Sequence, residues 1–267
     1  MPPITVAADI HLDHADEPAV DRFLTGLAAS SGESVLICGD ISVARRVVTD
    51  LERIADAAQR PIHFVLGNHD HYGGSIAAVR DAVTDLATRR PNVQWLPPAG
   101  VVQLDPLTTL IGVDGWADGR FGNAHATPLR LNDDRLIAEL ERQPDRAHRL
   151  AVKRALADAD AARLATLIER AASVSRTIVI ATHIPPFTEA LPTSGRLASR
   201  DWWPLLVCGA TGIVIRDAAG RLPSHRFLVL AGHSHVGRNV TIGPNLSVVV
   251  APARYGAPAC QVVRTSD

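Results

Sequence analysis

Short apolar runs rich in Val and Ile are the feature that most constrains the fold of this chain. They lack the strict alternation of a half-exposed strand, which is typical of strands buried on both faces. The runs lie at Ile4–Ala8, Val35–Cys38, Ile62–Leu66, Thr108–Val113, Ile178–Ala181, Phe227–Ala231, Ser247–Val250 and Gln261–Val263. Strands of this kind need another layer against each face.

Helix-like segments supply that layer between the early runs. Pro18–Ala29, Val43–Ala58 and Ser75–Ala87 each place apolar side chains at helical spacing, so that one face of each segment is apolar. This alternation of strand and helix predicts a layered α/β domain. From Arg226 onward, the pattern changes to successive strands linked by short turns such as 243–245.

The stretch from about residue 117 to 172 lacks strand signals. It predicts helices at Pro128–Arg142 and Ala147–Ala172, separated by Gln143–Pro144–Asp145. We expect a helical insertion at about 117–172 within a single domain covering 1–267. The insertion could lean over one end of the sheet, or it could cover one face as an ordinary crossover helix.

Composition limits the partners and the compartment. The 267 residues are 46% hydrophobic and carry a net charge of -1, so a full core is expected and nucleic acid is an unlikely partner. The N-terminus lacks the features of a signal peptide or a membrane span. The three cysteines are odd in number and widely spaced, and Cys38 lies in an apolar run. We therefore predict a cytoplasmic protein with no membrane partner, and leave the oligomeric state open.

Five of the apolar runs end in side chains that commonly bind metals. These side chains are Asp9 and His11, Asp40, Asn68 with His69 and Asp70, His183, and His233 with His235. Because strands of an α/β domain present functional groups at their carboxyl ends, the pattern predicts a single polar site. In an extended segment, residues two apart point to the same side, so Asp9 and His11 could converge on one cation.

Each of these clusters also has a simpler interpretation when taken alone. Asp40 precedes a predicted helix and could be its N-cap, and His233 and His235 could be solvated loop residues. Together, the oxygen and imidazole donors without thiolate suit Mn, Fe, Zn, Co or Ni. Two such ions about 3.5–4 Å apart form a clamp for in-line displacement at phosphorus, and a carboxylate between them would offset their repulsion.

The order of the motifs resembles the calcineurin-like metallophosphoesterase superfamily. Asp-x-His, Gly-Asp, Gly-Asn-His-Asp, a lone His after a strand and Gly-His-x-His follow one another from Asp9 to His235. The resemblance implies a four-layer αββα sandwich of two mixed β-sheets flanked by helices. It also implies two divalent or trivalent transition-metal ions as cofactors.

The resemblance further implies a role for each residue. Asp9, His11 and His235 would hold one metal, Asn68, His183 and His233 the other, and Asp40 would bridge them. A metal-bridging hydroxide would be the nucleophile. The catalytic residues would be His69, which would stabilise or protonate the leaving oxygen, and Asp70, which would support His69 or the loop.

One position departs from the Ser/Thr protein phosphatase branch of that superfamily. Members of the branch carry a second Asp after the Gly-Asp motif, and Val43 stands there in this chain. We therefore do not place the chain in that branch, and the orienting partner of His69 is left open. Arg45 and Arg46 could reach a phosphate or could begin a solvated helix.

The expected activity is cleavage of a phosphomonoester or phosphodiester of a small molecule by a dinuclear-metal-dependent phosphohydrolase. Two alternatives are a phosphodiesterase specific for small diesters of the cyclic-nucleotide type, and a non-catalytic scaffold that keeps the fold. A scaffold would be expected to lose ligands, and this chain has the whole set. The motifs do not specify the substrate or the native metals.

Overall fold

The computed structural model describes residues 3–264. Its strands are β1 (Ile4–Ala7), β2 (Ser34–Cys38), β3 (Ile62–Val65), β4 (Val93–Trp95), β5 (Val102–Asp105), β6 (Thr108–Gly112), β7 (Thr177–Ala181), β8 (Arg226–Ala231), β9 (Arg238–Gly243), β10 (Leu246–Val250) and β11 (Gln261–Val263). Its α-helices are α1 (Glu17–Ala29), α2 (Val47–Ala58), α3 (Ile76–Arg89), α4 (Leu96–Ala99), α5 (Asp133–Leu136), α6 (Ala138–Glu141), α7 (Arg146–Ala172), α8 (Trp203–Leu206) and α9 (Gly209–Arg221).

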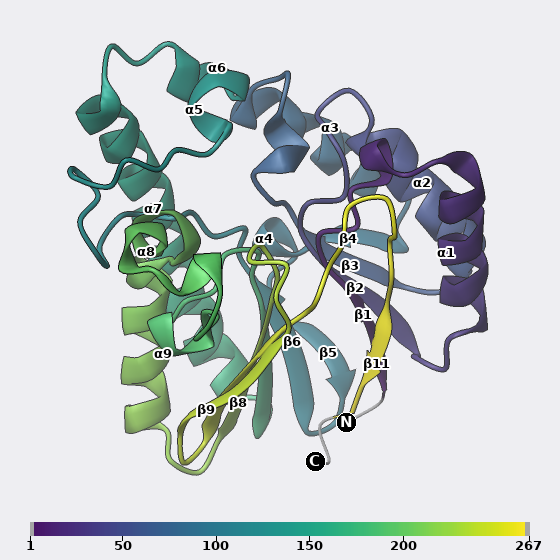
Figure 1. Ribbon diagram of the computed structural model, residues 1–267. Coiled ribbons are helices and arrows are strands. Elements are labelled where there is room, and N and C mark those ends of the chain that lie inside the picture. Colours follow the sequence, from purple (N-terminus) through teal and green to yellow (C-terminus); the bar gives the residue numbers. More distant parts are fainter. Residues whose placement is uncertain (1–2, 265–267) are drawn as a thin grey trace.

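The strands form two mixed sheets. The first has the order β11-β1-β2-β3-β4, and the second has the order β5-β6-β7-β8-β10-β9. Within the first sheet only β11 is antiparallel to its neighbour, whereas in the second sheet the edge strands β5 and β9 are. The inner strands therefore end at a common edge of each sheet. Helices α1 to α3 flank one sheet, and α7 and α9 flank the other (Figure 1).

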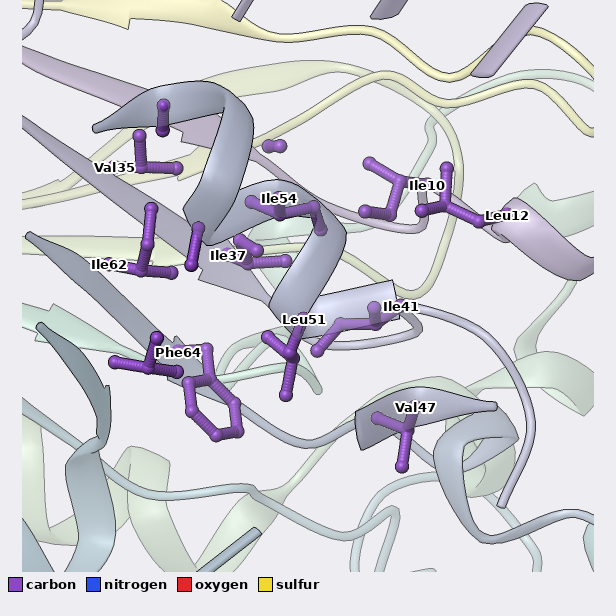
Figure 2. Close-up of a cluster of buried hydrophobic side chains, with 14 of the residues drawn as sticks. Ile10, Leu12, Val35, Ile37, Ile41, Val47, Leu51, Ile54, Ile62 and Phe64 are labelled. Atoms are coloured by element: carbon purple, nitrogen blue, oxygen red, sulfur yellow. The ribbon is translucent and has the colours of Figure 1, made fainter. Parts of the chain in front are cut away.

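Alternating side chains of the buried strands form three apolar layers. In β2, Leu36 and Cys38 join residues of the second sheet in the layer between the sheets. Val35 and Ile37 point the other way, toward α1 and α2. Figure 2 shows Leu51 and Ile54 of α2 with the strand residues of this outer cluster. Strands with two apolar faces thus explain the predicted αββα order, which the structure confirms.

The long helix α7 covers the outer face of the second sheet with its C-terminal half. Leu164, Leu167 and Ile168 belong to the same apolar cluster as residues of β6, β7 and β8. This is the arrangement expected of a crossover helix. Ala157 and Ala161, nearer the start of α7, instead pack with residues of α6 beside the ends of the strands.

Two predicted helices begin or continue differently in the structure. Pro128–Arg142 is not one helix, because its helical parts are only α5 and α6. The residue between them, Ile137, is fully buried and extended, and it forms a bridge with Gly74. Helix α2 begins at Val47 and not at Val43. Its N-cap residue, Arg46, forms an ion pair with Asp50 at 3.2 Å, in line with a helix start.

In the part of the chain that the structure describes, no helix combines the length and the apolar character needed to cross a bilayer.

Candidate metal centre

Seven predicted ligands come together at the carboxyl ends of strands from both sheets. The first sheet contributes Asp9 and His11 after β1, Asp40 after β2 and Asn68 after β3, and the second contributes His183 after β7 and His233 and His235 after β8. Their Asp and His ligand atoms form two groups, and within each group all of these atoms lie within 4.8 Å of one another. One group is Asp9, His11, Asp40 and His235, and the other is Asp40, His183 and His233. Because Asp40 belongs to both, the geometry fits two ions that share a carboxylate.

The distances within the first group leave room for one ion among the donors. The Nε2 atoms of His11 and His235 lie 3.2 Å apart. His235 Nε2 lies 3.4 Å from Asp9 Oδ1, and His11 Nε2 lies 3.7 Å from Asp40 Oδ2. Carboxylate and imidazole donors in this mixture suit a first-row transition metal.

The second group uses the other oxygen of Asp40. His183 Nε2 lies 3.4 Å from Asp40 Oδ1 and 3.0 Å from Asn68 Oδ1. His183 Nδ1 lies 2.9 Å from the carbonyl oxygen of Cys38, and His233 Nε2 lies 2.9 Å from that of Leu205. A ring nitrogen that faces a carbonyl oxygen carries the proton, so Nε2 of His183 and Nδ1 of His233 are left as metal donors.

The charge of the site also fits cations. Asp9 and Asp40 are both 1% exposed, which would be costly for carboxylates without positive partners. Burial lowers the pKa of His183, but Asp40 and then Asp9 raise it by more, to about 10. Without an ion, an imidazole would have to supply the positive charge that these carboxylates favour. The residues present therefore fit the two metal ions that the motifs imply.

The backbone of five predicted ligands is left-handed. In residues 3–264, six residues other than glycine have positive φ, and five of them are ligands: Asp9 (50°), His11 (40°), Asp40 (53°), His233 (69°) and His235 (58°). The extended geometry predicted for Asp9 and His11 is therefore wrong. These left-handed residues follow β1, β2 and β8, and each carries a cost of about 1–2 kcal/mol.

Glycines permit the close approach of the loops that carry these ligands. A Cβ atom on Gly67 would lie 2.1 Å from Asp40 Oδ1, and one on Gly232 would lie 2.4 Å from Asp9 Oδ2. The backbone N–H of His233 also donates to Asp9 Oδ1 at 2.9 Å. Asp40 therefore packs against the loop after β3, and Asp9 packs against the loop after β8. Any residue larger than glycine at position 67 or 232 would push these loops apart.

Asp70 holds two loops together. Its carboxylate accepts hydrogen bonds from the backbone N–H groups of Ile41, Ser42 and Gly67 at 2.8–2.9 Å. Burial and the nearby Asp40 raise the pKa of Asp70 to about 8, and the backbone donors oppose this rise. Of the two roles predicted for Asp70, the structure therefore supports the loop. All three donors are backbone groups. Within residues 3–264, no hydrogen bond joins the Asp70 carboxylate to the His69 ring.

His69 lies beside both groups without belonging to either. Its backbone N–H donates to Asp40 Oδ1 at 2.8 Å, and its ring centroid lies 4.6 Å from that of His11. The ring stacks on Tyr72 at 4.2 Å with an interplanar angle of 30°. Nδ1 of His69 is buried and has no hydrogen-bond partner in the described part of the chain. The contact that holds the His69 ring is thus stacking on Tyr72, and not a hydrogen bond to the Asp70 carboxylate.

Two further residues of the site carry no motif. Asp133 accepts hydrogen bonds from Asn68 Nδ2 at 2.8 Å and from the Tyr72 hydroxyl at 2.6 Å. Tyr255, between β10 and β11, is 48% exposed, and its ring centroid lies 4.4 Å from that of His11 and 4.9 Å from that of His235. It therefore covers part of the first ligand group on its solvent side. No local sequence signal marks either residue, because both reach the site through the tertiary fold.

The family model described as calcineurin-like phosphoesterase matches residues 2–237 of the chain. The chain belongs to the calcineurin-like phosphoesterase family. The predicted resemblance is thus confirmed over most of the sequence, and the family depends on two metals, in line with the buried Asp and His cluster. A search of curated proteins gives no match.

Solved structures with similar folds are distant in sequence. Phosphopantetheinyl hydrolase from Mycobacterium tuberculosis is 15% identical, with a TM-score of 0.68 over 100% of this chain and 96% of that one. A dimetal phosphatase from Danio rerio is 12% identical, with a TM-score of 0.59 over 94% and 87%. The protein TT1561 of Thermus thermophilus is 14% identical, with a TM-score of 0.56 over 94% and 89%. These likenesses show the metallophosphoesterase fold and do not point to the Ser/Thr phosphatase branch.

Proposed function

We propose that this family member is a dinuclear-metal phosphohydrolase that cleaves a phosphomonoester or phosphodiester of a small molecule. The observation that carries the proposal is the pair of ligand groups that share Asp40. Asp9, His11 and His235 would hold one ion with Asp40, and Asn68, His183 and His233 would hold the other. When bound, two such ions would supply an activated water as nucleophile and would offset the charge of the phosphoryl group.

The chain's own contribution to the chemistry would come from His69. Hydrolysis forms a bond from a water oxygen to phosphorus and breaks the bond from phosphorus to the leaving oxygen. That oxygen needs a proton as it departs, and a protonated His69 would donate it from beside the shared carboxylate. General acid catalysis of this kind typically contributes about 10²–10⁴-fold.

The substrate would approach from the side of Tyr255. This ring is half-exposed and the His235 side chain is 23% exposed, whereas Asp9 and Asp40 are buried. A small phosphoester could therefore place its phosphoryl group at the ligand groups and its remaining atoms against Tyr255. We keep a cytoplasmic location as part of this proposal, which cell fractionation would test.

The test begins with chelated protein reconstituted separately with Mn, Fe, Zn, Co or Ni. Metal content and turnover of an aryl phosphomonoester and an aryl phosphodiester are measured on the same samples, followed by nucleotides, cyclic nucleotides and a phosphopantetheine ester. The last is included because one structural neighbour is named as a phosphopantetheinyl hydrolase. Two bound ions and metal-dependent turnover are expected.

His69→Ala provides the matched variant. It should retain two ions and lose turnover by roughly 10²–10⁴-fold, since His69 lies outside both ligand groups. Undiminished turnover would remove His69 from the mechanism. Wild-type protein that holds both ions and is inert toward the whole panel would contradict the proposal and favour a scaffold role.

A further inference from the structure

A buried carboxylate from α5 contacts the only amide among the predicted ligands. Asp133 is 4% exposed and lies 65 positions after Asn68 in the sequence. Its Oδ1 accepts from Asn68 Nδ2 at 2.8 Å and from the Tyr72 hydroxyl at 2.6 Å. Asn68 Nδ2 also donates to the Tyr72 oxygen at 3.0 Å. Both hydrogens of the Asn68 amide are therefore used on the side away from His183.

Backbone hydrogen bonds fix the segment that carries Asp133. The Gly73 N–H donates to the Leu136 carbonyl at 2.8 Å, and the Ala138 N–H donates to the Gly74 carbonyl at 3.0 Å. Glu139 accepts from the Ile76 N–H at 2.9 Å, at the start of α3. These hydrogen bonds attach the short helices to the loop that follows the metal-site motif, and so they fix the position of Asp133.

A lysine on α7 holds the other oxygen of Asp133. Lys153 is 7% exposed, and its Nζ lies 3.5 Å from Asp133 Oδ2 and 3.0 Å from Asp134 Oδ1. Because a buried ammonium group stabilises a neighbouring carboxylate, Asp133 can act only as a hydrogen-bond acceptor here. The adjacent Asp134 contacts the same lysine. Among the described residues, Asp134 forms no hydrogen bond to Asn68.

The orientation of the Asn68 amide decides whether it can bind a cation. An asparagine can present either its oxygen or its NH₂ group to a given point, and only the oxygen is a metal donor. An acceptor on the far side forces the NH₂ group away and turns Oδ1 toward His183 Nε2, at 3.0 Å. Partners of this kind commonly change metal affinity by about 10–100-fold when they are removed.

We propose that Asp133 is a positioning residue that orients the Asn68 amide oxygen into the second ligand group and, through Tyr72, holds the His69 ring. This inference rests on the proposed function for the role of His69. The part that concerns Asn68 requires only that the site binds metal. Tyr72 connects the two parts, because its hydroxyl donates to Asp133 while its ring stacks on His69 at 4.2 Å.

Metal binding tests the Asn68 part without any need for turnover. Wild type, Asp133→Ala and Asp133→Asn are titrated with Zn²⁺ against a competing chelator, and thermal unfolding is measured on each metal-free protein. One of the two metal equivalents should bind about 10–100-fold more weakly in Asp133→Ala, with the other within about threefold of wild type. Asp134→Asn is the matched control, since it lies beside the same lysine, and it should bind both equivalents within about threefold.

The spectrum of the Co²⁺-loaded proteins gives a second measurement that a purely structural role would not change. The d–d bands of one site should shift in Asp133→Ala and not in Asp134→Asn. The inference is overturned if Asp133→Ala binds both equivalents like wild type, or if both equivalents weaken in parallel with the stability of the metal-free protein. If Asp133→Ala does not fold, the same criteria apply to Asp133→Leu, which also lacks a hydrogen-bond acceptor.

Tyr72 variants test the His69 part. Tyr72→Phe keeps the stacked ring, and Tyr72→Leu removes it. At matched metal content, Tyr72→Leu should have a kcat roughly tenfold or more below that of Tyr72→Phe, because only the Leu variant lacks the ring that holds the proton donor in place. Equal kcat in Tyr72→Leu and Tyr72→Phe would overturn this part. An inert wild type would contradict the proposed function and leave the metal-binding result standing on its own.

Discussion

The left-handed backbone at the ligands predicts an unusual stability difference at His235. In the metal-free protein, His235→Gly should be more stable than His235→Ala, although glycine usually destabilises. His235 has φ of 58°, where a residue with Cβ carries about 1–2 kcal/mol. The greater freedom of glycine in the unfolded chain offsets about 0.5–1 kcal/mol of this relief. A net gain of about 0.5–1 kcal/mol corresponds to roughly 2 °C in melting temperature.

Both variants lack the imidazole, so metal binding does not confound the comparison, and thermal unfolding of the chelated proteins measures it. His14 supplies the opposite control. It is half-exposed like a loop residue but lies in the short 3₁₀ helix Leu12–His14, where right-handed backbone favours alanine. His14→Gly should therefore be less stable than His14→Ala. If glycine is also the less stable choice at position 235, the left-handed backbone there carries no cost and the reasoning is refuted.

Two further predictions concern pH and substrate. Burial and then Asp114 raise the pKa of Asp160 to about 7, above its unfolded value, so the folded state holds the proton more tightly. The free energy of unfolding should therefore fall as pH rises from about 4 to 7. Asp160→Asn should flatten this dependence in urea titrations, and an unchanged slope would contradict the prediction. Tyr255→Ala should raise KM for the aryl diester several-fold at nearly constant kcat, whereas Tyr255→Phe should resemble wild type. Steady-state kinetics measures both constants, and an unchanged KM in Tyr255→Ala would contradict the proposed approach of the substrate.

The residues whose local pattern matches their final environment were predictable. Val35–Cys38 and Ile178–Ala181 are apolar on both faces because helices and a second sheet cover them, and both are strands in the structure. The ligands at the ends of these strands follow from the same logic. The sharing of Asp40 between two groups likewise agrees with a carboxylate placed between two cations.

Elements with weak local patterns were missed. Strand β4 is only three residues long, and the edge strand β5 is partly exposed along its length. Helix α9 contains three glycines that lower its intrinsic propensity, and one of them, Gly212, contacts the Pro186 backbone so closely that only glycine fits. In each case tertiary packing decides the conformation, and a single sequence does not display it.

The site shows the same division between local and distant information. Asp70 is the last residue of a recognisable motif, but the three backbone groups that it binds come from two loops, so its role required coordinates. Asp133 and Tyr255 lie in segments without catalytic patterns and enter the site from a helix start and from a loop after β10. Residues that act through distant contacts leave no periodicity or spacing to detect.

The division of ligands between the two sheets has a consequence for biosynthesis. As the chain leaves the ribosome, the first 95 residues contain all four parallel strands of the first sheet and the ligands up to Asn68. Neither ligand group can be completed at that stage, because His183, His233 and His235 have still to be translated. High-affinity metal capture is thus expected to follow translation of nearly the whole chain.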